Sequence, residues 1–254
     1  MNKQVILNNF SRYAYLYDDY AGIQQQAAED LADWMEAKGL RRILEIGCGT
    51  GNFTRLLRNK YKNSDIHALD ISEKMIEVAK EKLGDERIEF LVEDGESVVL
   101  SDKFDLITSN ACFQWFGDFE KAIAMYRGML VPGGRVLFSI FGPRTFIELN
   151  SALAQYSKDK MVSAAGFLPQ EKIEAIVKRN FREAQVREVI YQETFSSLAD
   201  LLRKIKYTGI RGRAFNGWGL WSVGKLKAIE RAYLDKHKQI KATYQVFFCK
   251  GVKG

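Results

Sequence analysis

The sequence is poor in the residues that most often carry metal sites and acid–base catalysis. Its 254 residues include two histidines and three cysteines. Cys48, Cys112 and Cys249 are scattered along the chain, which is typical of neither a disulfide framework nor a zinc cluster. His67 and His237 have no metal-ligand spacing to each other or to a cysteine. We therefore expect no structural metal and no reaction that depends on a histidine base.

Long hydrophobic runs are also missing. No segment approaches the roughly 20 consecutive apolar residues that cross a bilayer. The first residues lack the apolar core of a secretory signal. The apolar fraction of 46% is nevertheless that of an ordinary soluble globular protein. These features predict a cytoplasmic protein without a membrane partner.

Acidic residues are outnumbered by basic ones. Lys and Arg total 38, Asp and Glu total 32, and the formal net charge is +6. A basic surface attracts acidic or phosphate-bearing partners over long range. From composition alone, the partner could be a nucleic acid or an acidic carrier protein, or the protein could have no charged partner. The positive charges concentrate in the last quarter of the chain, at Arg203, Lys204, Lys206, Arg211, Arg213, Lys225, Lys227, Arg231, Lys236, Lys238 and Lys241.

Short buried segments alternate with amphipathic ones along the chain. Their periodicity predicts helices over residues 10–37, 52–60, 72–83, 119–130, 173–177 and 198–205. It predicts strands over residues 41–46, 66–70, 88–92, 104–109, 135–141, 186–195 and 242–248. Strands that alternate with helices favour a parallel sheet with helices on both faces.

We therefore expect an α/β fold of the Rossmann-like type, with a mostly parallel seven-stranded sheet. No low-complexity linker separates two domains, so a single domain is predicted over residues 1–254. Its expected parts are an N-terminal helical cap (1–40), a cofactor-binding core (41–142), a helical insertion after the fifth strand (143–180) and a C-terminal part (181–254). This last part contains a Gly-rich, basic and aromatic loop over residues 207–221.

The sharpest feature of the sequence is the segment Glu45-Ile46-Gly47-Cys48-Gly49-Thr50-Gly51. Alternate glycines let the backbone turn tightly and approach a ligand at the end of a strand. Asp70 closes the next strand at the distance expected of a carboxylate that accepts from ribose hydroxyls. The spacing differs from the Gly-x-Gly-x-x-Gly that seats a pyrophosphate. Glu45 would also repel a pyrophosphate, and it suits the amino group of a methionine-derived cofactor.

Further candidates for this cofactor site lie at the ends of the third and fourth strands. Asp94 and Gly95 follow the third strand, where an acidic side chain can accept from an adenine amino group. Asn110 and Trp115 follow the fourth strand, where an aromatic ring can form a wall of the site. The predicted cofactor-binding residues are Gln24, Glu45, Gly47, Cys48, Gly49, Gly51, Asp70, Ile71, Met75, Asp94, Gly95, Asn110 and Trp115.

The segments 43–51, 69–70, 104–115 and 130–134 resemble the motifs of class I S-adenosylmethionine methyltransferases. This resemblance covers the cofactor-binding core and its N-terminal flank. It implies the Rossmann-like fold of that class, S-adenosyl-L-methionine as the cofactor and S-adenosyl-L-homocysteine as the product.

Shorter segments are similar to the malonyl-acyl-carrier-protein methyltransferases of biotin synthesis. This similarity implies transfer of a methyl group to the free carboxylate of a malonyl thioester, with an acidic acyl carrier protein as partner. Ile210-Arg211 departs from the pattern of that family after Gly209. The similar segments run the whole length of the chain and comprise Asn9 to Arg12, Tyr17-Asp18, Ala21, Gln24 to Gln26, Ser109 to Trp115, Phe167 to Pro169, Lys206 to Gly209 and Thr243-Tyr244.

The implied reaction can be compared with the side chains present. A malonyl carboxylate is ionised at neutral pH, because its pKa lies near about 4, so no general base is required. Selecting malonyl over acetyl requires a cation. Lys206, Arg144 and Arg211 are the candidates, and Tyr17 is a candidate to orient the substrate.

Other functions remain open on the sequence. A methyltransferase of a small metabolite, such as a quinone precursor, would have the same core. An RNA methyltransferase would use the C-terminal positive charges, but no separate RNA-binding module is visible, so nucleic acid is disfavoured. An NAD-dependent oxidoreductase and a non-catalytic cofactor sensor are the remaining alternatives.

Overall fold

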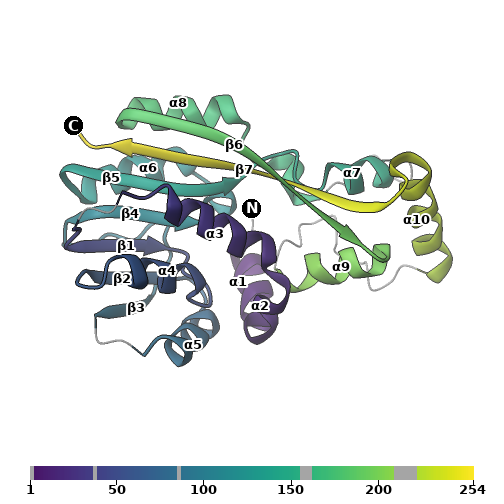
Figure 1. Cartoon of the computed structure of the whole chain (residues 1–254), viewed down its shortest axis with the longest axis horizontal. Helices are drawn as coiled ribbons and strands as arrows, with labels where there is room; N and C mark the ends of the chain where they lie inside the picture. The colour runs from purple at the N-terminus through teal and green to yellow at the C-terminus, as the bar shows by residue number, and fades with distance from the viewer. Residues whose placement is uncertain (1–2, 37–38, 85–86, 155–161, 209–221) are drawn as a thin grey trace.

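The computed structural model describes residues 3–36, 39–84, 87–154, 162–208 and 222–254. These residues form a seven-stranded sheet with the order β3-β2-β1-β4-β5-β7-β6 (Figure 1). Strand β7 is antiparallel to both of its neighbours, and β1 to β5 are parallel. The predicted mostly parallel, Rossmann-like sheet is confirmed. The strands are β1 (Arg42–Ile46), β2 (Asp65–Asp70), β3 (Ile88–Val92), β4 (Phe104–Asn110), β5 (Leu130–Phe141), β6 (Arg182–Phe195) and β7 (Ile240–Val252).

Helices cover both faces of the sheet because successive strand residues point to opposite sides. Ile43 and Leu106 pack in one hydrophobic cluster with α3 and α4, whereas Leu44 and Ile107 pack in another with α6 and α8. The described helices are α1 (Lys3–Tyr13), η1 (Ala14–Leu16), α2 (Tyr17–Tyr20), α3 (Gly22–Asp33), α4 (Asn52–Lys60), α5 (Glu73–Lys82), η2 (Phe113–Trp115), α6 (Phe119–Met129), α7 (Ile147–Leu153), η3 (Ser163–Gly166), α8 (Gln170–Asn180), α9 (Leu198–Tyr207) and α10 (Val223–His237).

The N-terminal segment is not the single helix predicted over residues 10–37. It is divided into α1, η1, α2 and α3, and the last of these already ends at Asp33. The chain bends at η1, where Ala14 is buried against Met75 and Val78 of α5. Beyond the bend, α3 buries Ala27 and Leu31 in the core. The division lets one segment cover two different surfaces, which a straight helix could not do.

Strands β6 and β7 extend beyond the rest of the sheet toward α7, α9 and α10 (Figure 1). Strand β7 pairs with β5 only from Val246 to Val252, and its first half pairs with β6 alone. This two-stranded extension carries Tyr244. Residues 209–221, which make up most of the predicted Gly-rich loop, lie outside the described residues. So do residues 155–161 of the predicted helical insertion.

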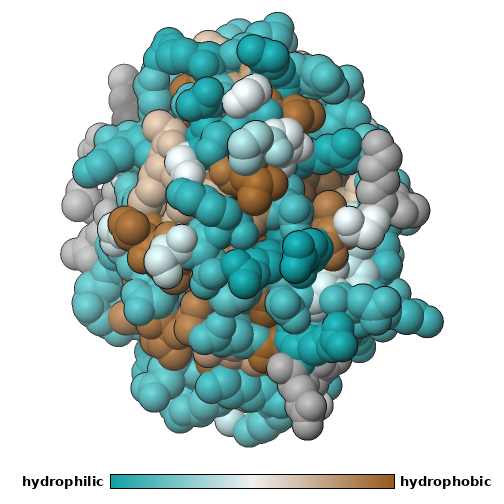
Figure 2. All heavy atoms as spheres, turned by 90° about the vertical axis from the view of Figure 1, so that its left-hand side faces the viewer, coloured by the Kyte–Doolittle hydropathy of each residue, from teal (hydrophilic) through white to brown (hydrophobic). Residues whose placement is uncertain are grey.

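The surface follows the amphipathic pattern of the helices. In α4, Phe53 and Leu57 are buried while Arg55 and Asn59 are exposed, which is the arrangement of a helix with one core-facing side. Figure 2 shows the end of the molecule at the left of Figure 1, where hydrophobic residues lie in small groups among hydrophilic ones. Among the described residues, no helix combines the length and the apolarity needed to span a membrane.

Candidate active site

The glycine turn connects β1 to α4 and requires glycine for two reasons. Gly47, Gly49 and Gly51 all have left-handed backbone angles, with φ of +70°, +54° and +82°. Gly47 is also pressed against the loop after β4, because a Cβ atom there would lie 2.4 Å from the Sγ atom of Cys112. At Gly51 a Cβ atom would lie 2.8 Å from Leu83. The turn therefore packs closely on both neighbouring segments.

The N–H groups of the turn are hydrogen-bonded within the protein. Gly47 and Cys48 both donate to the carbonyl oxygen of Leu69, at 2.8 and 2.9 Å. Gly49 donates to the Oδ2 atom of Asp70 at 3.0 Å, and Gly51 donates to the carbonyl oxygen of Cys48 at 3.0 Å. A dinucleotide site instead directs backbone N–H groups at a pyrophosphate. The observed bonding thus disfavours the oxidoreductase alternative.

A cleft of about 760 Å³ lies beside the turn, at the carboxyl ends of β1, β2 and β4. Strands β1 and β4 are adjacent although β2 and β3 lie between them in sequence, so this is the switch point where such sheets bind ligands. Its lining includes the predicted residues Tyr17, Gly47, Gly49, Asp70, Ile71, Met75, Asp94, Gly95, Asn110 and Trp115.

A second hollow of about 390 Å³ shares part of this lining and adds two more predicted residues, Gln24 and Cys48. Two predicted residues support the site from behind. Gly51 is the N-cap of α4, and Glu45 is buried in β1 with 1% of its surface exposed. The structure thus places every predicted cofactor-binding residue in the lining of these two hollows or next to a lining residue in the chain. Their contacts with a cofactor stay predictions.

Asp70 is held in a fixed orientation at the end of β2. Its Oδ2 atom accepts from Gly49, and its Oδ1 atom accepts from the N–H group of Ser72 at 2.8 Å. Burial raises the pKa of Asp70 to about 6, although these two backbone bonds oppose the shift. At neutral pH the side chain is therefore a carboxylate that faces the cleft. This arrangement suits the predicted acceptor for ribose hydroxyls.

Glu45 and Gln24 present buried acceptor atoms that the protein itself does not pair. Within the described part of the chain, the Oε2 atom of Glu45 and the Oε1 atom of Gln24 have no hydrogen-bond partner. Burial raises the pKa of Glu45 to about 8, and the negative charge of Asp70 adds to the shift. Buried acceptors without partners are costly unless a ligand supplies donors. The ammonium group of S-adenosyl-L-methionine has such donors, so these residues fit the predicted cofactor.

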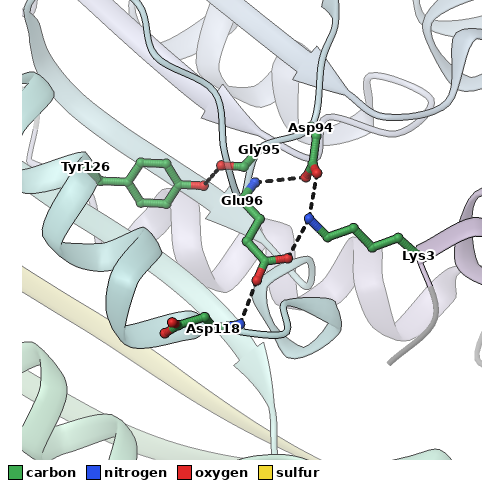
Figure 3. A network of polar contacts seen from close by, with 6 residues as sticks. All are labelled: Lys3, Asp94, Gly95, Glu96, Asp118 and Tyr126. Carbon is green, nitrogen blue, oxygen red and sulfur yellow. Dashed lines mark hydrogen bonds and ion pairs between the residues drawn. The ribbon is translucent and has the colours of Figure 1, made fainter.

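The adenine end of the predicted site is fixed by a polar network (Figure 3). Asp94 accepts from the N–H group of Glu96 at 3.0 Å and from the Nζ atom of Lys3 at 2.5 Å. The hydroxyl of Tyr126 donates to the carbonyl oxygen of Gly95 at 2.6 Å. These bonds tie the loop after β3 to α1 through Lys3 and to α6 through Tyr126.

Sequence reasoning missed the contribution of α1 to the lining. Lys3, Ile6 and Phe10 line the cleft from this helix. Their spacing of three and four residues places them on one face, and this periodicity was the available signal. The sequence does not show which surface that face covers.

Aromatic side chains and the amide of Asn110 form the part of the cleft at the carboxyl end of β4, where we expect the methyl acceptor. Asn110 donates to the carbonyl oxygen of Gln24 at 2.9 Å and so ties β4 to α3. The ring of Trp115 contacts Phe10 and Phe167 edge to face, at 5.9 and 5.6 Å between centroids. Burial raises the pKa of Tyr17, so its hydroxyl keeps its proton and can donate a hydrogen bond.

Two of the three predicted cations, Lys206 and Arg144, lie outside the described lining of the cleft. The Nζ atom of Lys206, in α9, lies 5.5 Å from the ring of Tyr13 and 5.1 Å from that of Tyr207. Tyr207 stacks on Tyr20 of α2 at 4.6 Å, so α9 meets the N-terminal helices here. Arg144 is exposed and contacts Glu188 of β6 at 3.3 Å. Arg211, the third candidate, lies outside the described residues.

Comparison with known proteins agrees with this site. Residues 44–138, which contain the turn and the end of β4, match a methyltransferase domain family. "Malonyl-[acyl-carrier protein] O-methyltransferase 1" of Ilyobacter polytropus is 36% identical over 238 residues, which are 93% of this chain and 88% of that protein. The protein named "Malonyl-[acyl-carrier protein] O-methyltransferase" from Bacillus cytotoxicus is 32% identical, over 98% of this chain and 91% of that protein.

These similarities extend over almost the whole of both chains. The chain belongs to the malonyl-[acyl-carrier protein] O-methyltransferase family. Its predicted identity as a methyltransferase is therefore confirmed, and the cleft is the candidate active site of a member of this family.

Solved structures share the fold at lower sequence identity. The YcgJ protein of Bacillus subtilis has a TM-score of 0.63 and 17% identity, over 90% of this chain and 98% of that one. A phosphoethanolamine N-methyltransferase of Haemonchus contortus, solved in complex with S-adenosyl-L-methionine, has a TM-score of 0.62 and 20% identity. The match covers 96% of this chain and 57% of that protein. At these identities the likeness concerns the fold.

Replacing Gly47 by alanine tests the close packing of the turn on the loop after β4. We expect Gly47→Ala to lower the free energy of unfolding by about 2–4 kcal/mol, because the Cβ atom meets Cys112 and φ is left-handed. The affinity for S-adenosyl-L-methionine should also fall by about tenfold or more. Urea denaturation and titration calorimetry measure the two effects. Gly22→Ala is the control, because nothing lies within 4 Å of the added atom. Wild-type affinity in Gly47→Ala would contradict the assigned packing.

Glu45 should make the protein without cofactor less stable as the pH rises. The folded-state pKa of Glu45 is about 8, above the ordinary 4.5, so folding retains a proton that the unfolded chain releases between these values. The contribution of Glu45 to the free energy of unfolding is therefore fully present below the unfolded pKa. It is lost as the pH rises from there to about 8, at no more than about 1.4 kcal/mol per pH unit. Glu45→Gln should remove this component from urea denaturation measured between about pH 5 and about pH 8. Parallel stability curves for the two proteins would refute it.

Proposed function

We propose that this chain methylates the free carboxylate of a malonyl thioester carried by acyl carrier protein and so forms the methyl ester. The methyl donor is S-adenosyl-L-methionine, which supplies its methyl group from a sulfonium sulfur. Membership of the malonyl-[acyl-carrier protein] O-methyltransferase family supports this reaction. The resemblance to the enzymes of biotin synthesis favours an early step of that route.

The observation that carries the proposal is that the described lining of the cleft contains no histidine and that its two carboxylates already accept hydrogen bonds, Asp70 from Gly49 and Ser72 and Asp94 from Lys3 and Glu96. His67 contacts Glu89 at 3.0 Å and His237 contacts Ser151 at 2.8 Å, both away from that lining. Cys112 does line the cleft, but burial and the charge of Asp70 raise the pKa of its thiol, so it stays protonated. A site of this kind suits an acceptor that is already an anion. A carboxylate with a pKa near about 4 meets that requirement.

The residues around the cleft have distinct roles in this proposal. Glu45 and Gln24 receive the ammonium group of the cofactor, Asp70 the ribose and Asp94 the adenine amino group. Trp115 and the apolar residues beside it exclude water from the acceptor side. Exclusion of water favours the transfer, because the carboxylate and the sulfonium lose their charges together. Orientation of the reacting groups then supplies the remaining acceleration.

We favour Lys206 over Arg144 as the cation for the malonyl carboxylate. Arg144 already contacts the carboxylate of Glu188. Lys206 has no carboxylate partner among the described residues, and its neighbours Tyr13 and Tyr207 are aromatic. The helix that carries it meets the N-terminal helices through Tyr20. A cation that is not neutralised by the protein can discriminate malonyl from acetyl.

Helix α10 offers a basic surface for the acidic carrier protein. Four of its cations and C-terminal neighbours are exposed, and none forms an ion pair within the described part of the chain. Unpaired surface cations steer acidic partners and raise the rate of association at low salt. These four are Lys227, Arg231, Lys236 and Lys238.

Methyl transfer to carrier proteins tests the proposed reaction. With labelled S-adenosyl-L-methionine, malonyl carrier protein should be methylated and the acetyl form should not, because acetyl lacks the free carboxylate. The rate at limiting carrier protein should fall as salt is raised, because screening weakens the steering. Methylation of a free metabolite with no reaction of either carrier protein would overturn the proposal and favour the small-metabolite alternative. Methylation of RNA alone would overturn it as well.

The proposed role of Lys206 predicts a difference between two cations. Lys206→Met should raise the KM for malonyl carrier protein by about ten- to a hundredfold, because the carboxylate would lose its charged partner. The affinity for S-adenosyl-L-methionine should change less than about twofold. Arg144→Met is the matched control and should alter the KM by less than about threefold. Equal effects of the two variants would remove Lys206 from this role.

A further inference from the structure

Helix α1 lies beside the predicted adenine end of the cleft, where Ile6 and Phe10 pack against the core. It supplies Lys3, Ile6 and Phe10 to the lining, yet none of its residues is buried. At its C-terminal end the hydroxyls of Ser11 and Ser72 are 2.8 Å apart. The next residue that is fixed in a core is Ala14. Helix α1 is therefore attached through its partly buried apolar face and through the end that leads into η1.

At the other end of α1, Lys3 forms ion pairs with two carboxylates of the segment after β3. The Nζ atom of Lys3 lies 2.5 Å from the Oδ2 atom of Asp94 and 2.7 Å from the Oε2 atom of Glu96. Figure 3 shows Lys3 reaching from α1 to both carboxylates. Glu96 is anchored in turn, because its Oε1 atom accepts from the N–H group of Asp118 at 2.6 Å. Asp94 and Glu96 are thus held in place by the protein where Lys3 contacts them.

These ion pairs are made entirely between groups of the protein. They stabilise the covered arrangement of the cleft whether or not a cofactor lies beneath it. An interaction that stabilises the closed form equally with and without ligand leaves the affinity unchanged. Such an interaction acts on the rates of ligand entry and exit instead, wherever it has to break before the ligand can pass.

We propose that Lys3 is a latch that closes α1 over the adenine end of the cleft. By this contact with Asp94 and Glu96 it sets the rates at which S-adenosyl-L-methionine enters and S-adenosyl-L-homocysteine leaves. Lys3 is a positioning residue for the cover, and its ion pairs act on the exchange rates. The latch is independent of the methyl acceptor.

Cofactor-exchange kinetics test the latch. The probe is S-adenosyl-L-homocysteine, followed by stopped-flow tryptophan fluorescence, because Trp115 lines the cleft. Lys3→Met should raise the association and dissociation rates together by about threefold to tenfold, with the Kd changed less than about twofold. Lys3→Arg should restore slow exchange. Glu96→Gln should also speed exchange, and its amide oxygen can still accept from Asp118.

Lys74→Met is the matched control, because Lys74 is an exposed lysine that contacts Glu77 on α5 at 2.6 Å. It should leave both rates unchanged. At about 0.5 M salt the wild-type rates should approach those of Lys3→Met, because the pairs are partly exposed. Unchanged rates in Lys3→Met, with thermal unfolding showing a folded protein, would overturn the latch. A rise in Kd with an unchanged association rate would also overturn it, since Lys3 would then contact the cofactor.

Discussion

The end of β1 and the loop after β4 lie closer together than a side chain at Gly47 would allow. A Cβ atom there would lie 2.4 Å from Cys112, and the left-handed φ of Gly47 excludes most other residues independently. The same turn directs two N–H groups at Leu69 and one at Asp70. The close approach of β1 and the loop after β4 depends on Gly47, and the orientation of the Asp70 carboxylate depends on the N–H group of Gly49 in the same turn.

Building a cofactor site at this position has an electrostatic cost. Asp70 and Glu45 are carboxyl groups in buried surroundings, and burial raises the pKa of both. Backbone bonds from Gly49 and Ser72 offset part of this cost for Asp70. Glu45 keeps an unpaired Oε2 atom within the described structure. Such strain is common where a protein is organised for a ligand, and the family of methyltransferases to which the chain belongs agrees with that interpretation.

Much of this site could be predicted from the sequence because its determinants are local. The spacing of Gly47, Gly49 and Gly51 predicts left-handed backbone angles at these positions. The sequence separation between this turn and Asp70 is that of one helix and the strand that follows it. Helix and strand periodicity gave the layers and the mostly parallel sheet. The N-terminal helix was predicted wrongly as one piece, since the bend at η1 depends on the burial of Ala14 against α5. No local pattern marks that contact.

What the sequence determined by itself was the fold class, the cofactor turn and the methyltransferase family, because each depends on neighbours in the chain. The tertiary structure decided which distant groups meet. Lys3 and Asp94 are 91 positions apart in the chain, yet they form one ion pair over the cleft. Arg144, a candidate cation for the malonyl carboxylate, contacts Glu188 on β6, 44 positions further along the chain. Such contacts depend on strand order and on how α1 packs, which are set by burial across the whole molecule.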